Sequence, residues 1–341
     1  MVNMLHRLVP YFLLVIIIAL FGKVNPAAIK DCGGWRPCLE RDAVKKGVPR
    51  TWFSTWNSTV QAKLERLAAI SRAQQSAKGK PDGVLVVMTG DSTIIQQFQV
   101  LSEFVYLRSD FIPVQGDRAE IQQKYEVTFG APRGTTGSVT FVFYRVFENC
   151  MVSPSNTHVR QAFAVYFGCG LHLLHLFPVQ HPAMLKVALH SWINYETLLR
   201  NRVKGFRKVN ENVKLVYMTT HPIVESKYFG AWKETLEGYQ ARDPKYVEPC
   251  IEEFKKTLSG RSLTREELEY MCLDTVFGAR SVEMLNRRGL SAVRGLNVSV
   301  VPAHQLLAGE SWATGDGDGR HYMLLVPVEL FWFFTMLEDG G

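Results

Sequence analysis

The chain lacks a recognisable nucleic-acid-binding module, an internal repeat and a low-complexity tract. Its 39 lysines and arginines outnumber its 32 aspartates and glutamates, which gives a formal net charge of +7. Because neither a zinc knuckle nor an RNP-like segment accompanies this charge, we expect no nucleic-acid partner. We interpret the excess as solvated faces, or as attraction to an anionic glycan or membrane surface. The hydrophobic content of 47% is ordinary for a globular protein.

Familiar sets of metal ligands are also missing. Three histidines, His172, His175 and His181, lie near Cys169, but their spacing matches no closed zinc site. We therefore expect neither a bound metal nor a cofactor.

Long hydrophobic runs are scarce. Residues 8–21 are almost wholly apolar and are flanked by Arg7 and Lys23, a pattern typical of a signal peptide or signal anchor over residues 1–23. The run is short for a bilayer span, so cleavage near residues 26–28 and retention in a thin early-secretory membrane both stay open. We expect either a single-pass type II membrane protein of the ER or Golgi lumen, or a secreted protein. Contact with the membrane is expected only through this segment.

A second apolar segment covers residues 321–337. It is also short, and it contains Pro327 and Glu329. We therefore expect a buried closing helix rather than a second membrane span.

Cysteines are few but even in number, which is compatible with disulfides in an oxidising compartment. They are Cys32, Cys38, Cys150, Cys169, Cys250 and Cys272. Six cysteines allow fifteen pairings, and a cytosolic enzyme with reduced cysteines remains the alternative. The sequon at Asn57 predicts N-glycosylation, whereas a second sequon at Asn297 is discounted because it falls in an expected core strand.

The chain divides into a stem and one alternating domain. Residues 24–80 are expected to form the stem, which ends in an amphipathic helix over residues 60–75. Residues 81–341 alternate between strand-like and helix-like segments, which predicts an α/β domain with a mostly parallel sheet covered by helices on both faces. The expected strands cover residues 84–89, 138–144, 161–167, 213–218 and 296–301, and the expected helices cover residues 93–107, 183–203, 248–258, 264–287 and 321–337. The irregular segment 108–137 is expected to form a loop over the functional site.

Two short motifs at opposite ends of this domain carry the candidate chemistry. A Gly-Asp-Ser triplet ending at Ser92 directly follows the apolar run 84–88, and open α/β sheets hold their ligands where such strands end. A serine hydroxyl becomes an effective nucleophile when an imidazole removes its proton and a carboxylate orients that imidazole. Asp318 and His321 supply both groups at the expected start of the last helix. The alternative is an ordinary turn and an ordinary helix start, because either motif alone is common.

Five blocks of the chain follow the order found in SGNH-type hydrolases. The blocks begin at Gly90 (GDSTIIQQF), Val139 (VTFVFYR), Phe167 (FGCGLH), Val216 (VYMTTHP) and Asp318 (DGRH). The chain most resembles the lumenal branch that includes the PC-esterase and trichome-birefringence-like proteins, with their GDS block and C-terminal Asp-x-x-His. The resemblance implies a flavodoxin-like three-layer α/β/α sandwich. It also implies an enzyme that moves or removes acetyl groups on glycans.

The same resemblance implies a role for each residue of the two motifs. Ser92 would be the nucleophile, His321 the general base and then acid, and Asp318 its orienting partner. The third block departs from the family, which commonly has an asparagine two residues after the glycine, because Gly170 is followed there by His172. A neutral His172 imidazole could donate to an oxyanion, or it could be a satisfied core histidine. The second-block glycine stays open between residues 134 and 137.

Four further residues border the expected site. Gly90 and Asp91 precede the candidate nucleophile and are candidates for oxyanion or substrate contact. Arg145 closes a strand, where it could bind an anionic or hydroxyl-rich substrate or pair with a structural carboxylate. His221 follows another strand and is expected either to line the pocket or to enter a helix.

A basic run over residues 200–208 is interpreted as the C-terminal end of a helix, capped near Gly205.

The sequence thus favours a secretory-pathway serine esterase or O-acyltransferase, acting on a carbohydrate through an acyl-Ser92 intermediate. A transferase would need an acyl donor in the lumen, and hence a donor-transporting partner. The alternative is a catalytically inactive SGNH-like domain that binds glycans or partners, because His172 is unusual and the second-block glycine is unassigned. A lipid esterase is a third hypothesis.

Overall fold

The computed structural model describes most of the chain from residue 35 onward. The described residues are 35–78, 83–105, 123–130, 138–145, 151–168, 171–174, 182–315 and 319–338. The expected signal segment and much of the expected covering loop lie outside these ranges.

The described strands form one sheet in the order β2-β3-β1-β4-β5-β6. Their bounds are β1 Val84–Gly90, β2 Gln123–Gly130, β3 Ser138–Arg145, β4 Ala164–Gly168, β5 Lys214–Met218 and β6 Ser299–Val301. The five neighbouring strands from β3 to β6 run parallel, and β2 pairs antiparallel with β3 at one edge. Numbered in chain order, the parallel strands lie 2-1-3-4-5, the order of flavodoxin-like doubly wound sheets. The predicted α/β class with a mostly parallel sheet is confirmed.

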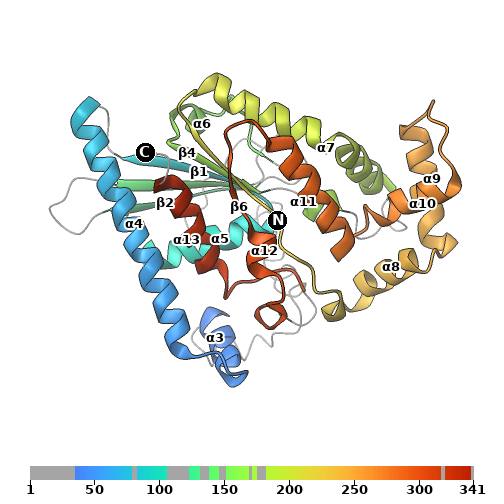
Figure 1. Cartoon of the computed structure of the whole chain (residues 1–341), viewed down its shortest axis with the longest axis horizontal. Coiled ribbons are helices and arrows are strands. Elements are labelled where there is room, and N and C mark those ends of the chain that lie inside the picture. Colours follow the sequence, from blue (N-terminus) through green and yellow to red (C-terminus); the bar gives the residue numbers. More distant parts are fainter. Residues whose placement is uncertain are drawn as a thin grey trace, which may run out of the picture.

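Helices cover both faces of the sheet (Figure 1). They are α3 Trp35–Lys45, α4 Arg50–Lys78, α5 Ser92–Val105, α6 Thr157–Gln161, α7 Pro182–Val209, α8 Gly230–Gln240, α9 Pro244–Thr257, α10 Arg265–Leu273, α11 Ala279–Val293, α12 Ala303–Leu307 and α13 Val326–Glu338, with 3-10 turns η1 Leu171–Leu173, η2 Glu225–Lys227 and η3 Ser311–Ala313. Val86 and Met88 of β1 belong to the core layer that includes buried residues of α4, α5 and α13, whereas Val87 belongs to the layer that includes buried residues of α7 and α11. Alternate residues of this buried strand therefore enter the two opposite core layers.

The last helix, α13, starts later than the sequence predicts. The prediction began this helix at His321, but α13 begins at Val326. Proline is tolerated in the first turn of a helix and disrupts its interior, so Pro327 fixes the start close to itself. His321 therefore lies in the loop before α13 rather than on it. Within the part of the chain that the structure describes, no helix is both long and apolar enough to cross a bilayer.

Two other predicted segments differ from the structure. The expected irregular segment 108–137 contains the edge strand β2. The expected helix 264–287 is two helices, because α10 ends at Leu273 and α11 starts after Gly278. Both errors arise where short-range periodicity gives no signal: an edge strand has little apolar alternation, and a helix break needs only a few residues.

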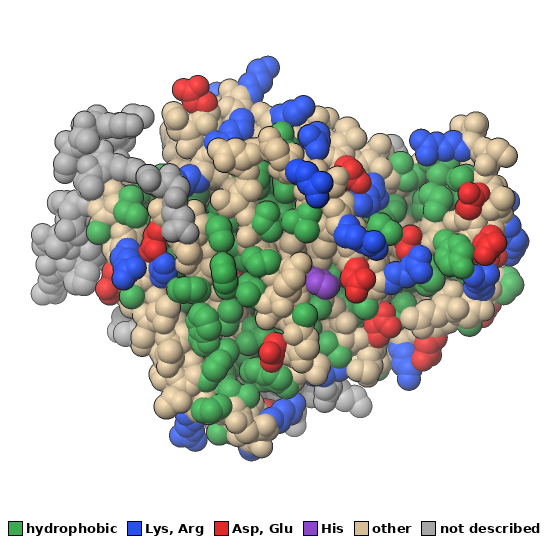
Figure 2. All heavy atoms as spheres, in the orientation of Figure 1, with side chains coloured by type: hydrophobic (Ala, Val, Ile, Leu, Met, Phe, Trp, Pro, Cys, Tyr) green, Lys and Arg blue, Asp and Glu red, His purple; other side chains and the backbone are tan. Residues whose placement is uncertain are grey.

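The basic run 200–208 lies within α7, which continues through Gly205 to Val209. Gly205 is not a cap: a Cβ there would lie 2.7 Å from the ring of Pro154. Arg207 donates hydrogen bonds to the carbonyl oxygens of Val213 and Asn297, at 2.6 and 2.8 Å. Lysine and arginine side chains over α7 and α11 are visible in Figure 2. Part of the basic charge thus ties α7 to the neighbouring loops.

The two sequons lie in different environments. Asn57 is half-buried in the middle of α4. Asn297 is exposed in the turn before β6, with φ 51°, and so lies outside the core strand to which the sequence assigned it. β6 begins only at Ser299, which explains the difference.

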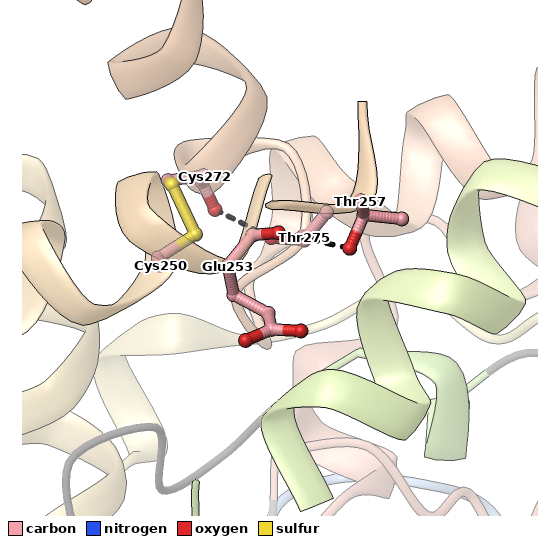
Figure 3. Close-up of a disulfide and its surroundings, with 5 residues drawn as sticks. All are labelled: Cys250, Glu253, Thr257, Cys272 and Thr275. Atoms are coloured by element: carbon pink, nitrogen blue, oxygen red, sulfur yellow. Dashed lines mark hydrogen bonds between the residues drawn. A yellow bond between two sulfur atoms is a disulfide. The ribbon is translucent and has the colours of Figure 1, made fainter. Parts of the chain in front are cut away.

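A disulfide joins Cys250 of α9 to Cys272 of α10 (Figure 3). Both residues are fully buried, among apolar side chains such as Ile251 and Leu268. Disulfides persist in oxidising compartments, so this bond favours the secretory pathway.

Candidate active site

The strand order reverses direction at β1 and β4, whose carboxyl ends lie side by side. Strand β3 lies on one side of β1, and the next parallel strand in the chain, β4, lies on the opposite side of β1. Such a reversal of strand order is a topological switch point, where doubly wound folds bind their ligands. Gly90 and Gly168 are paired in register at these strand ends. A Cβ on Gly90 would overlap the carbonyl oxygen of Gly168 and lie 2.7 Å from Cγ1 of Ile94. The absence of a side chain at Gly90 therefore lets the two strand ends approach each other.

Asp91 fixes the turn from β1 into α5. Its Oδ1 accepts hydrogen bonds from the backbone nitrogen of Thr93 at 2.9 Å and from the Thr93 hydroxyl at 2.7 Å, which caps the helix. Its Oδ2 accepts a bond from the backbone nitrogen of Leu171 at 3.3 Å, just after β4. The sequence makes Asp91 a candidate for substrate contact, but its buried carboxylate positions the backbone.

Ser92 and His321, which are 229 residues apart, meet at this end of the sheet. The Nε2 atom of His321 lies 2.9 Å from Oγ of Ser92. Ser92 is the first residue of α5 and is partly exposed, whereas His321 is largely buried. An imidazole nitrogen at this distance can accept the hydroxyl proton.

Several residues that the sequence singles out lie outside the described side chains. These are Asp318, Gly170, His172, Arg145, Cys169, His175 and His181. For two of them the backbone is known: Arg145 pairs in register with Gly90, and His172 lies in η1. Both backbones therefore lie near the carboxyl ends of β1 and β4. In the described part of the chain, no group of three or more metal-ligating residues occurs.

His221 is fully buried beside the loop that carries His321. Its Nε2 atom lies 2.7 Å from Oε1 of Glu329 on α13, and both side chains have no exposed surface. Its Nδ1 atom lies 3.2 Å from the carbonyl oxygen of Arg320, one residue before His321. Burial alone would lower the pKa of His221, but the Glu329 carboxylate and the Arg320 carbonyl raise that pKa above its ordinary value.

Glu329 has a second buried partner. Its Oε2 atom accepts a hydrogen bond at 2.7 Å from Nε2 of Gln97, which lies on α5, the helix that starts at Ser92. In the sequence, Glu329 argues only against a membrane span, and no motif links it to Gln97 or His221. A single carboxylate in an apolar helix was the available signal, because such a group needs a buried partner.

The loop that carries His321 is held at further points. The backbone nitrogen of Val224 donates to the carbonyl oxygen of Gly319 at 2.7 Å. The guanidinium of Arg320 lies over the rings of Trp232 and Phe277, 4.3 and 5.1 Å from their centroids. The segment after β5 and the aromatic side chains of Trp232 and Phe277 thus anchor the loop.

Comparison with protein-family models finds no match for this chain, and no curated protein matches its sequence. Its function must therefore be argued from the chemistry of the residues that the fold brings together.

Proposed function

We propose that this protein is a serine esterase or O-acyltransferase of the SGNH type, with Ser92 as nucleophile and His321 as general base. The observation that carries the proposal is the 2.9 Å distance from His321 Nε2 to Ser92 Oγ at the switch point of the sheet. A serine and an imidazole in hydrogen-bond contact form the core of acyl-transfer sites on many unrelated folds.

In the proposed reaction, Nε2 of His321 accepts the hydroxyl proton while Oγ of Ser92 attacks the ester carbonyl. The resulting imidazolium returns that proton to the leaving oxygen as the C–O bond breaks, which leaves an acyl group on Ser92. Water or a second hydroxyl then attacks the acyl-serine, with His321 again taking and returning the proton. We propose Asp318, three residues before His321, as the carboxylate that orients the imidazole.

Oxyanion stabilisation is proposed to start at the N-terminus of α5. The backbone N–H of Ser92 is the first of this 14-residue helix, where unpaired N–H groups and the helix dipole favour negative charge. The backbone N–H of Leu171 is already bonded to Asp91, which leaves Gly170 and His172 as further candidate donors. Each well-placed donor typically contributes about 3–4 kcal/mol to lowering the barrier.

For the substrate we propose an acylated carbohydrate, with acetyl as the acyl group, in the secretory pathway. The buried disulfide supports such a compartment. The sequence resemblance supports the substrate class, and a transferase would depend on a partner that delivers the acyl donor.

Labelling of the active serine tests the proposal. A fluorophosphonate probe should modify wild-type protein at Ser92, which peptide mass mapping locates, and p-nitrophenyl acetate should be hydrolysed. Both signals should be lost in Ser92→Ala and reduced about 100-fold or more in His321→Ala, with the fold retained by circular dichroism. Ser102→Ala, also on α5 but buried away from its N-terminus, is the matched control and should behave as wild type.

The same two assays also identify the alternative functions. A well-folded wild-type protein that neither reacts with the probe nor hydrolyses the ester would support the binding-domain alternative. A preference for long acyl chains over acetyl would instead favour a lipid esterase.

A further inference from the structure

A buried histidine–carboxylate pair lies beside the loop that carries His321. His221 and Glu329 have no exposed surface, and they face each other at 2.7 Å. The other inward residues of α13, such as Leu330 and Phe333, are apolar. An apolar side chain in place of Glu329 would fill the same layer without the desolvation penalty that a buried carboxylate carries. Packing alone therefore does not account for this pair.

The pair connects the elements that carry the two reacting side chains. Glu329 accepts a hydrogen bond from Gln97 at 2.7 Å, on the helix that starts at Ser92. His221 lies 3.2 Å from the carbonyl oxygen of Arg320, whose peptide bond leads into His321. The pair thus bridges α5, α13 and the loop before α13.

The arrangement requires a proton on Nδ1 of His221. A carbonyl oxygen only accepts hydrogen bonds, so an unprotonated Nδ1 would face the Arg320 oxygen lone pair to lone pair. Glu329 favours this state, because an ionised carboxylate at Nε2 stabilises the doubly protonated ring. The Glu329 carboxylate and the Arg320 carbonyl oxygen therefore together favour a His221 ring that carries a proton on each nitrogen.

We propose that His221 and Glu329 act as a positioning pair, which holds the 319–321 loop so that the His321 imidazole stays aligned with Ser92. The proposal rests on the proposed function, because alignment matters for acyl transfer. Neither residue is a catalytic residue, since the contacts described for them are with each other, with Gln97, with the ring of Tyr322 and with the loop backbone. Misplacement of a reacting group by about 1 Å can reduce a rate about 100-fold, so this hydrogen bond can affect turnover strongly.

Two substitutions of His221 separate positioning from stability. The amide nitrogen of glutamine reaches the position of Nε2, so His221→Gln keeps a donor for Glu329 but loses the bond to Arg320. The amide nitrogen of asparagine reaches the position of Nδ1, so the double variant His221→Asn with Glu329→Gln keeps the bond to Arg320 and removes the buried charge. His304→Gln, which changes a half-buried histidine of α12, is the matched control.

We expect His221→Gln to lower kcat for p-nitrophenyl acetate by about 100-fold with KM within about twofold of wild type, and to lower the melting temperature because the buried Glu329 loses its histidine partner. The double variant should recover at least about tenfold of that loss, even if it melts earlier. If activity in the variants simply follows their melting temperatures, or if the double variant recovers nothing, the positioning role is wrong.

Failure of the proposed function is recognised separately. A wild-type protein without hydrolysis or serine labelling would reject the enzyme, and the imidazole NMR signals of His321, assigned through His321→Ala, then provide the test. Altered His321 signals in His221→Gln, with unchanged signals in His304→Gln, would support positioning. Unchanged signals in both variants would overturn it.

Discussion

Two glycines, Gly90 and Gly168, lie where the ends of β1 and β4 approach each other, beside Ser92. The positions paired across β1 and β4, Gly90 and Gly168, differ in what an added methyl group would meet. At Gly90 it would overlap a backbone carbonyl oxygen, which cannot move without shifting β4. At Gly168 it would lie 3.0 Å from the terminal carbons of Ile94 and Met218, and side-chain ends can adjust. The same substitution should therefore have unequal effects.

We expect Gly90→Ala to destabilise the fold by about 3 kcal/mol or more and to abolish labelling of Ser92, because the strand end must shift. Gly168→Ala should cost about 1 kcal/mol and retain labelling. Urea unfolding and probe labelling of the two variants provide the comparison. Equal losses of stability would contradict the close backbone approach at Gly90.

The buried pair also predicts how stability changes with pH. The pKa of His221 is raised in the folded protein, although burial opposes this, because Glu329, the Arg320 carbonyl and the nearby Asp91 favour the charged ring. Burial lowers the pKa of His304 on α12, and the charge of His221 lowers it further, although Glu283 opposes this. Because the pKa of His221 is higher in the folded than in the unfolded protein, its protonation stabilises the fold. This stabilisation is complete below the pKa of the unfolded state and is lost as the pH rises through the pKa of the folded state.

Wild-type protein should therefore lose unfolding free energy relative to His221→Gln as the pH increases from about 6 to about 9. Urea unfolding of both proteins across this range measures the difference between them. A difference that is constant with pH, or that grows in favour of wild type at high pH, would contradict the assigned direction.

At the scale of elements, the sequence predicts best where a segment carries its own signal. The run Val84–Met88 is continuously apolar and ends in a Gly-Asp-Ser turn, and β1 with α5 forms there as predicted. β2 was missed because one edge strand gives no buried run. The start of α13 was misplaced because the apolar pattern continues upstream of Pro327, although the chain there forms a loop.

Site residues, too, are predictable from the sequence only where a local motif marks them. Ser92 and His321 are identified by short motifs, and the structure places them in contact. The link from Glu329 to His221 joins residues 108 positions apart and depends on how α13 lies across the sheet, which no local pattern encodes. The sequence shows that His221 follows β5, which leaves pocket lining and helix entry open, but it does not reveal that the side chain is fully buried.

At the scale of the whole molecule, the site and the disulfide lie in different parts of the fold. The reacting pair is at the carboxyl ends of β1 and β4, whereas Cys250 and Cys272 join α9 and α10 within the helical region between β5 and α11 (Figure 1). This region contributes α8, whose Trp232 contacts Arg320 on the loop before α13. Mass mapping without reductant should detect the Cys250–Cys272 bond in protein from the secretory pathway, and six free thiols would contradict that compartment.

The disulfide should support stability more than chemistry. It closes a loop with a sequence separation of 22 residues, and the loss of such a link typically costs about 3 kcal/mol through the entropy of the unfolded chain. We expect the Cys250→Ala, Cys272→Ala double variant to unfold at lower urea concentration but, while folded, to label at Ser92 at nearly the wild-type rate. Because α8 connects this region to the His321 loop, a large loss of labelling in folded variant would show that the helical region holds the site in place. The stability of the helical region and the geometry of the Ser92–His321 pair would then be coupled through the contact between Trp232 and Arg320.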